Sequence, residues 1–225
     1  MPLHFANSAA QAFFWLFVAL FAVAAVASLF FSYKRKQVLA DLIKAAAMLF
    51  LGTAMVCLLP SAPLVYFSCY LLALSALGQA KSSRPLNCIA VAILAASQSL
   101  NIAVISGHLS YGIPVYVYIL VGVAVLAGLT ASLLLPKKWN VKAFLFDGML
   151  IFPAIAMIFA ALLLADGLLY SKIFLLVGYF FFVGESSTPD KSDEEHALRG
   201  YYKNIFYFIG QLLIYFGLVL SITVL

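Results

Sequence analysis

A long apolar run without any charge, FFWLFVALFAVAAVASLFF at residues 13–31, most constrains how this chain can fold. Across the whole chain, 66% of residues are hydrophobic and 9% are charged, whereas about a quarter of the residues in a soluble domain are charged. So few polar groups would not cover the surface of a soluble domain. The strands of a membrane β-barrel alternate apolar and polar residues, and this run does not. The sequence therefore predicts an integral membrane protein built from helices.

Apolar stretches of about 17–25 residues are long enough to cross a bilayer as helices. The connections between them, such as SYKRKQ and PKKWN, are short, so we expect successive helices to be antiparallel neighbours in one bundle. The predicted fold is an all-α, polytopic transmembrane helical bundle of about eight helices, in a single domain over residues 1–225. The expected helices are 11–32, 38–59, 62–80, 86–106, 113–135, 143–165, 168–185 and 205–225.

Basic residues are distributed very unevenly between the two sets of loops. One set holds nearly all of them, whereas the loops on the other side offer only Lys172. Because cytoplasmic loops carry the excess of Lys and Arg, we expect both termini on the non-cytosolic side, and a bacterial inner membrane suits the short chain. The net charge of +5 then reflects topology and attraction to anionic lipids, not nucleic acid binding. The basic residues of the first set are Lys34, Arg35, Lys36, Lys81, Arg84, Lys137, Lys138, Lys142, Lys191, Arg199 and Lys203.

Ionisable groups at membrane depth are costly, so each is a candidate functional residue. With the predicted orientation, five helices carry polar groups in the cytosolic third of the bilayer, which predicts a polar layer and a cavity that opens to the cytosolic leaflet. The members of this layer are Asp41, Lys44, Gln79, Asp147, Glu185 and Gln211.

Several members of the layer also have purely structural interpretations, which stay open. Asp41 and Lys44 lie three residues apart on one helix face and can neutralise each other. Asp147 can serve as a partner of Lys44, and Glu185 can simply mark the end of its helix with its carboxyl group in water. Gln79 and Gln211 can hydrogen-bond between helices.

Three polar features lie outside this layer. His108 lies at the other end, where the fourth expected helix leaves the membrane, and an interfacial histidine is its structural interpretation. In the fourth expected helix, SQSLN at residues 97–101 lies near mid-membrane and either lines a polar shaft or ties the helix to its neighbours; the second is favoured. The acidic segment DKSDEEH at 190–196 lacks the ligand spacing of calcium and zinc sites. It predicts a solvated loop that can cap the last helix, and we expect no metal and no cofactor.

Short polar motifs recur near the helix ends from Lys44 to the C-terminus. The second expected helix contains KAAAMLFLGTAM, beginning at Lys44, and the third ends in SALGQ with Gln79. The fourth ends in GHLSY, which contains His108 and Tyr111. The seventh ends in the aromatic-rich run before FVGES, with Glu185, and the last contains YFIGQ, with Tyr207 and Gln211.

In their order and position, these motifs resemble those of the YhhN-type lysoplasmalogenase family of integral membrane proteins. The chain departs from the family pattern at Gln79 and Glu185, since the family has an aspartate at both positions. The resemblance implies hydrolysis of the vinyl-ether bond of lysoplasmalogens to a fatty aldehyde and a glycerophospho-base. It implies substrate-binding roles for Lys44, Gln79, His108, Tyr207 and Gln211.

Vinyl-ether cleavage needs a proton on the alkene carbon and then water on the resulting cation. An apolar wall favours the protonated form of a carboxyl group, so Glu185, behind GYFFFV, is the expected general acid. Asp147 is its expected partner because of its depth, by analogy with the paired carboxylates of glycosidases. Lys44 either holds the lipid phosphate or orients a carboxylate.

Two other functions stay open from the sequence. A relative that binds lipid without catalysis fits the neutral Gln79. A small-molecule or lipid transporter is the second alternative, although the two halves show no repeat of the kind that transporters often have.

Overall fold

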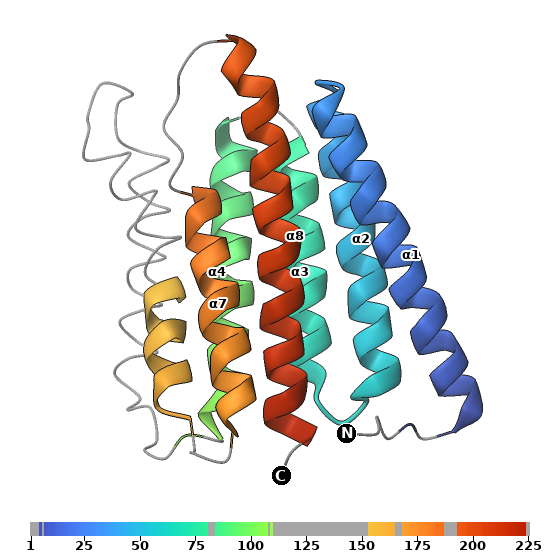
Figure 1. Ribbon diagram of the computed structural model, residues 1–225, viewed down its shortest axis with the longest axis vertical. Helices are drawn as coiled ribbons and strands as arrows, with labels where there is room; N and C mark the ends of the chain where they lie inside the picture. The colour runs from blue at the N-terminus through green and yellow to red at the C-terminus, as the bar shows by residue number, and fades with distance from the viewer. Residues whose placement is uncertain are drawn as a thin grey trace.

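The computed structural model describes residues 5, 7–80, 84–107, 109, 153–164, 168–186 and 193–223. Within these residues every regular secondary-structure element is a helix, and the only β-type pairing is an isolated bridge between Leu109 and Leu164. The helices run along a common direction (Figure 1). They are α1 (Ser8–Tyr33), α2 (Gln37–Leu58), α3 (Pro63–Ala80), α4 (Arg84–Ser106), an unlabelled helix Pro153–Leu162, α7 (Leu169–Ser186) and α8 (Asp193–Thr223).

Five helices of the described part are long and apolar enough to cross a membrane, which supports a multi-pass membrane protein. The first four agree with the expected spans to within a few residues. The expected span 113–135 lies outside the described residues, and that at 143–165 is described only from residue 153 onward. The five are Ser8–Tyr33, Gln37–Leu58, Pro63–Ala80, Ile89–Ser106 and Tyr201–Thr223.

The last helix begins earlier than predicted. We expected a loop over 186–203, but α8 is helical from Asp193. The first residues of α8 are Asp193, Glu194 and Glu195, and carboxylates are favourable there because they complement the partial positive charge of a helix N-terminus. The acidic segment is therefore the first turn of α8 from residue 193 onward, and the prediction of a loop was wrong for these residues.

Consecutive helices pack side by side as antiparallel neighbours, as the short connections predicted. Contacts join α1 to α2, α2 to α3, α3 to α4 and α7 to α8, and α8 also contacts α1 and α4. The end of α1 and the start of α2 therefore lie at the same end of the bundle as the end of α3 and the starts of α4 and α8 (Figure 1, top). This end is the one that the sequence predicts to be cytosolic.

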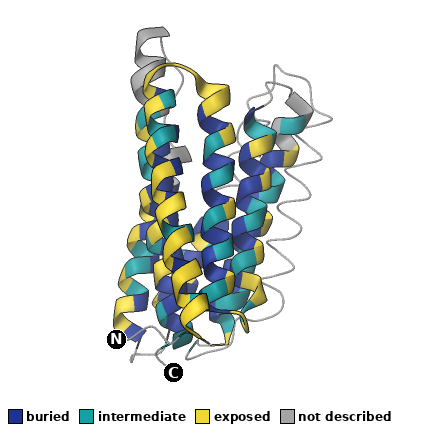
Figure 2. Ribbon diagram, turned by 90° about the vertical axis from the view of Figure 1, so that its right-hand side faces the viewer, coloured by how far each residue is buried: buried dark blue, intermediate teal, exposed yellow. Residues whose placement is uncertain are grey.

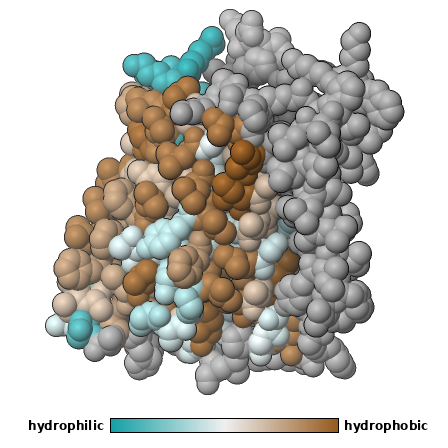
Figure 3. Space-filling view, turned by 180° about the vertical axis from the view of Figure 1, so that it is seen from behind, coloured by the Kyte–Doolittle hydropathy of each residue, from teal (hydrophilic) through white to brown (hydrophobic). Residues whose placement is uncertain are grey.

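The bundle buries a core of apolar and polar side chains and also exposes many large apolar ones. Inward faces are buried and outward faces exposed, most clearly on α1 (Figure 2). Val23 is 68% exposed and Phe180 is 71% exposed, for example. On the face that lies behind in Figure 1, apolar side chains cover most of the described surface (Figure 3). An apolar surface of this extent needs a covering, and the hydrocarbon of a bilayer provides it.

Glycines permit the close approach of α7 and α8. A Cβ added to Gly178 would lie 2.8 Å from Ile214 Cγ1, 2.9 Å from the Ile214 backbone nitrogen and 3.0 Å from the Gly210 carbonyl oxygen. Because two of these atoms belong to the backbone, no side-chain rotation relieves the contact. The two helices must move apart to accept a side chain there.

We therefore expect Gly178→Ala to lower the free energy of unfolding by about 1–3 kcal/mol, the usual cost of overpacking. This cost would outweigh the gain of about 1 kcal/mol in helix propensity. Gly107→Ala is the matched control, since a Cβ at Gly107 would meet nothing within 4 Å. Thermal unfolding in detergent measures both variants, and a Gly178→Ala protein as stable as wild type would contradict the packing described above.

Candidate functional site

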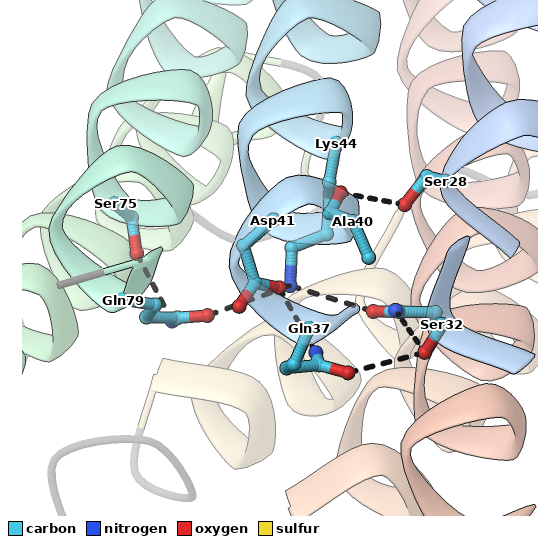
Figure 4. A network of polar contacts seen from close by, with 9 residues as sticks. Ser28, Ser32, Gln37, Ala40, Asp41, Lys44, Ser75 and Gln79 are labelled. Atoms are coloured by element: carbon cyan, nitrogen blue, oxygen red, sulfur yellow. Dashed lines mark hydrogen bonds and ion pairs between the residues drawn. The ribbon is translucent and has the colours of Figure 1, made fainter. Parts of the chain in front are cut away.

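A buried lysine lies at the centre of the most polar part of the bundle. Lys44 of α2 is only 4% exposed, and its Nζ lies 3.2 Å from Asp41 Oδ1. The same nitrogen donates to Gln79 Oε1 of α3 and to Asn204 Oδ1 of α8, each at 3.5 Å. It also lies 4.9 Å from the centre of the Tyr207 ring. We call these five residues, which join three helices, the Lys44 cluster; Figure 4 labels Asp41, Lys44 and Gln79 of this cluster.

A ring of hydrogen bonds holds the acidic side of the cluster in position. Gln37 Nε2 donates to Asp41 Oδ1 at 3.2 Å, and Ser32 Oγ of α1 donates to Gln37 Oε1 at 3.2 Å. Asn204 Nδ2 then donates to Ser32 Oγ at 3.1 Å. Since the Asn204 amide group donates to Ser32, its oxygen is directed at Lys44, and the ring links α1, α2 and α8 (Figure 4).

The two charges of the cluster are both buried, since Asp41 is 6% exposed and Lys44 is 4% exposed. Taking two ions out of water costs several kcal/mol each, and only close pairing with further hydrogen bonds offsets that cost. Here the amide oxygens of Gln79 and Asn204 and the face of the Tyr207 ring complete the surroundings of the ammonium group. The cluster is therefore neutral overall but strongly polarised, with its charges held at defined positions.

Asp41 and Lys44 have two interpretations, as a structural ion pair and as functional residues. Their mutual neutralisation is confirmed by the 3.2 Å ion pair. The two functional roles expected of Lys44, holding a lipid phosphate or orienting a catalytic carboxylate, stay predictions. Gln79 forms a hydrogen bond between helices, because it accepts from Lys44 and donates to Ser75 Oγ of its own helix at 3.4 Å.

The other predicted site residues are Tyr207, Gln211, Glu185, His108 and Asp147. Tyr207 belongs to the Lys44 cluster, whereas Gln211 lies one turn further along α8, fully buried. Glu185 lies in the last turn of α7. His108 and Asp147 lie outside the described residues. Of the members of the predicted polar layer, the structure brings Asp41, Lys44 and Gln79 into contact, and the depth of the layer in the membrane stays a prediction.

Sequence reasoning missed Asn204, Ser32 and Gln37. Asn204 fell between the expected loop and the expected last helix, so its face could not be assigned. The spacing of Asn204, Tyr207 and Gln211 is that of one helix face, and this signal would have grouped Asn204 with the other two once α8 was extended.

A second group of buried polar side chains lies deeper and ties four helices together. Ser68 Oγ of α3 lies 2.8 Å from Asn101 Oδ1 of α4 and 2.6 Å from the Tyr215 hydroxyl of α8. The Tyr179 hydroxyl of α7 donates to Gln98 Oε1 at 2.7 Å, and Asn101 Nδ2 donates to both Gln98 Oε1 and the Tyr179 hydroxyl. We call these five residues the tyrosine network. The interpretation of residues 97–101 as ties between helices is confirmed for Gln98 and Asn101.

An apolar groove opens on the outer surface where α1 adjoins α8. It has a volume of about 400 Å³ and is lined by Val26, Leu29, Phe30 and Tyr33 of α1 and by Tyr201 of α8. The rings of Tyr33 and Tyr201 lie 5.9 Å apart. Tyr33 and Tyr201 are near in sequence to Ser32 and Asn204, whose hydrogen bond joins α1 to α8.

The described residues contain no group of three or more His, Cys, Asp or Glu side chains that could hold a metal ion. In comparisons with known proteins, no family model, no curated protein and no solved structure matches the chain. The resemblance to the YhhN-type family stays a prediction from the sequence motifs.

Proposed function

We propose that this protein is a membrane-embedded hydrolase that cleaves the vinyl-ether bond of lysoplasmalogens, releasing a fatty aldehyde and a glycerophospho-base. The observation that carries the proposal is the Lys44 cluster, a buried ion pair inside an apolar helical bundle. Charged groups at membrane depth are expensive and usually functional. The proposal includes eight helices, both termini on the non-cytosolic side and a bacterial inner membrane.

The reaction divides into proton transfer and water addition. A carboxyl group donates a proton to the alkene carbon, which leaves an oxocarbenium ion. Water then adds to the cationic carbon and gives its proton to a carboxylate, and the hemiacetal breaks down to the aldehyde and the alcohol. Glu185 is proposed as the general acid, and Asp147 as the carboxylate that accepts the proton of water.

We assign the Lys44 cluster to binding of the polar part of the substrate. The ion pair of Lys44 and Asp41 provides a fixed local field in a water-poor interior, where electrostatic interactions are stronger than in water. Lys44, Gln79 and Tyr207 come from three helices and meet around one point, which suits recognition of a polar headgroup. His108 and Gln211 complete the proposed substrate-binding set.

The groove between α1 and α8 supports a lipid substrate. Its apolar wall suits a hydrocarbon chain, and two of its lining residues, Tyr33 and Tyr201, are near in sequence to the Ser32 and Asn204 pair at the edge of the Lys44 cluster. In this arrangement a single-chain lipid enters sideways from the bilayer, with its chain on the outer surface and its headgroup directed inward.

Aldehyde release from a lysoplasmalogen by the purified protein in detergent tests the proposal. We expect aldehyde from the vinyl-ether lipid and no hydrolysis of an ester lysophospholipid with the same headgroup, because proton transfer to an alkene carbon does not cleave an ester. No aldehyde from a folded wild-type protein would contradict the proposal.

A second candidate, a lipid-binding protein without catalysis, is favoured by one observation. Gln79 is neutral where the family pattern has an acid, and its amide oxygen already accepts a hydrogen bond from Lys44. Saturable binding of lysoplasmalogen without turnover would support this candidate, and Gln79→Asp would then test whether an acid at this position restores activity.

A further inference from the structure

Gln211 is buried with neither end of its amide group satisfied. The residue is 0% exposed, and both Nε2 and Oε1 lack a hydrogen-bond partner. Among the described residues, the only other buried side-chain polar atom without a hydrogen-bond partner is Gln98 Nε2 of the tyrosine network. Leaving buried donors and acceptors unpaired is costly, and native proteins rarely do so without a bound water or ligand.

Gln211 lies on the same face of α8 as three other buried polar residues. Asn204, Tyr207, Gln211 and Tyr215 follow one another along a single face of α8 at helical spacing. Gln211 is one turn from Tyr207 of the Lys44 cluster and one turn from Tyr215 of the tyrosine network. Its amide group therefore lies between the two groups of polar side chains, in the interior of the bundle.

The chemistry of the surroundings defines what can bind. The tyrosine network and Gln211 contain only neutral side chains, so an ion bound there would be left without a countercharge in a low-dielectric interior. An apolar group would leave the amide donors and acceptor unpaired. A hydroxyl group fits, because its oxygen accepts from an amide NH₂ while its hydrogen is donated to Gln211 Oε1.

We infer that Gln211 forms an internal binding site for a neutral O–H group, with the free NH₂ of Gln98 as a second donor at the edge of the tyrosine network. Two sources share this chemistry, namely water and the alcohol group of a lipid. Water is the expected occupant, because a buried water makes about three hydrogen bonds to otherwise unsatisfied groups. The inference does not depend on the proposed hydrolase, although a hydrolase at membrane depth needs a supply of water.

Radiolytic footprinting of the full chain in lipid-free detergent tests for water. Bound water produces hydroxyl radicals that oxidise adjoining side chains, so we expect the buried Tyr215 and Tyr179 to be oxidised in wild type. Gln211→Leu should reduce this oxidation several-fold and lower the melting temperature, because the variant loses its bound water. Gln11→Leu is the matched control, since Gln11 is exposed on α1, and it should change neither quantity.

A second arm distinguishes a lipid alcohol from water. With a lipid as the occupant, both tyrosines would stay unoxidised in detergent, and a monoalkylglycerol would raise the melting temperature of wild type but not of Gln211→Leu. The inference of an O–H site would then hold with a different source. Three results together would overturn it: unoxidised tyrosines, no effect of the monoalkylglycerol, and a melting temperature of Gln211→Leu at or above that of wild type. Oxidation that is unchanged in Gln211→Leu would also overturn it.

Discussion

Replacing Asp41 with Asn is expected to lower the free energy of unfolding by about 3–5 kcal/mol, the typical cost of breaking a buried ion pair at one partner. The ammonium group of Lys44 would stay buried at 4% exposure without its countercharge, 3.2 Å from a neutral amide. The oxygens of Gln79 and Asn204, both at 3.5 Å, cannot replace a full negative charge. Thermal or denaturant unfolding in detergent measures the change.

A second substitution makes this prediction sharper. Because Gln79 Oε1 already contacts Lys44 Nζ, Gln79→Glu in the Asp41→Asn protein returns a carboxylate of the same length to the same ammonium group from α3. We expect the double variant to recover much of the lost stability. In the wild-type background Gln79→Glu should instead destabilise, since two buried carboxylates would then share one lysine.

The controls separate the buried pair from general charge effects. Lys44→Met should destabilise as Asp41→Asn does, whereas Lys36→Met should not, because Lys36 is exposed. Removing both partners with Asp41→Leu and Lys44→Met should cost less than removing either alone, since no unpaired charge remains. An Asp41→Asn protein as stable as wild type would contradict the description of the Lys44 cluster.

Glu185→Gln is expected to reduce aldehyde release by about 10²–10⁴-fold, the usual contribution of a general acid. Glutamine keeps the size of the side chain but cannot donate a proton of suitable acidity. Glu185 lies in the last turn of α7, directly after the aromatic-rich run GYFFFV in the sequence, and it is the proposed general acid. The measurement is the rate of aldehyde formation from a lysoplasmalogen at saturating concentration.

Matched variants identify the role of the acid. Glu185→Asp should retain activity, because it keeps the carboxyl group and is the residue in the family pattern. Asp147→Asn should lose activity, and Glu194→Gln, in the first turn of α8, should not. Aldehyde release that survives both Glu185→Gln and Asp147→Asn would keep the hydrolase and remove these two residues from its catalytic site.

The sequence predicted only part of the candidate site. The pairing of Asp41 with Lys44 followed from their spacing on one helix, and Gln79 was assigned to the same depth from the topology. Asn204 and Ser32 were not identified, since hydroxyl and amide side chains near helix ends are common in membrane proteins and carry no signal alone. Their role depends on contacts such as that between Asn204 and Lys44, which are distant in the chain.

The sequence alone determined that the chain lies in a lipid bilayer, that its fold is helical, and the bounds of the first four helices. A chain in a bilayer must satisfy its backbone hydrogen bonds within each segment, so the lengths of the apolar runs dictate where helices lie. The tertiary structure decided where α8 begins, which polar faces meet, and that Lys44 is paired with Asp41 while Gln211 is left unpaired. These features depend on how each helix rotates and how closely it packs, as at Gly178 and Gly210, and local sequence does not encode that rotation.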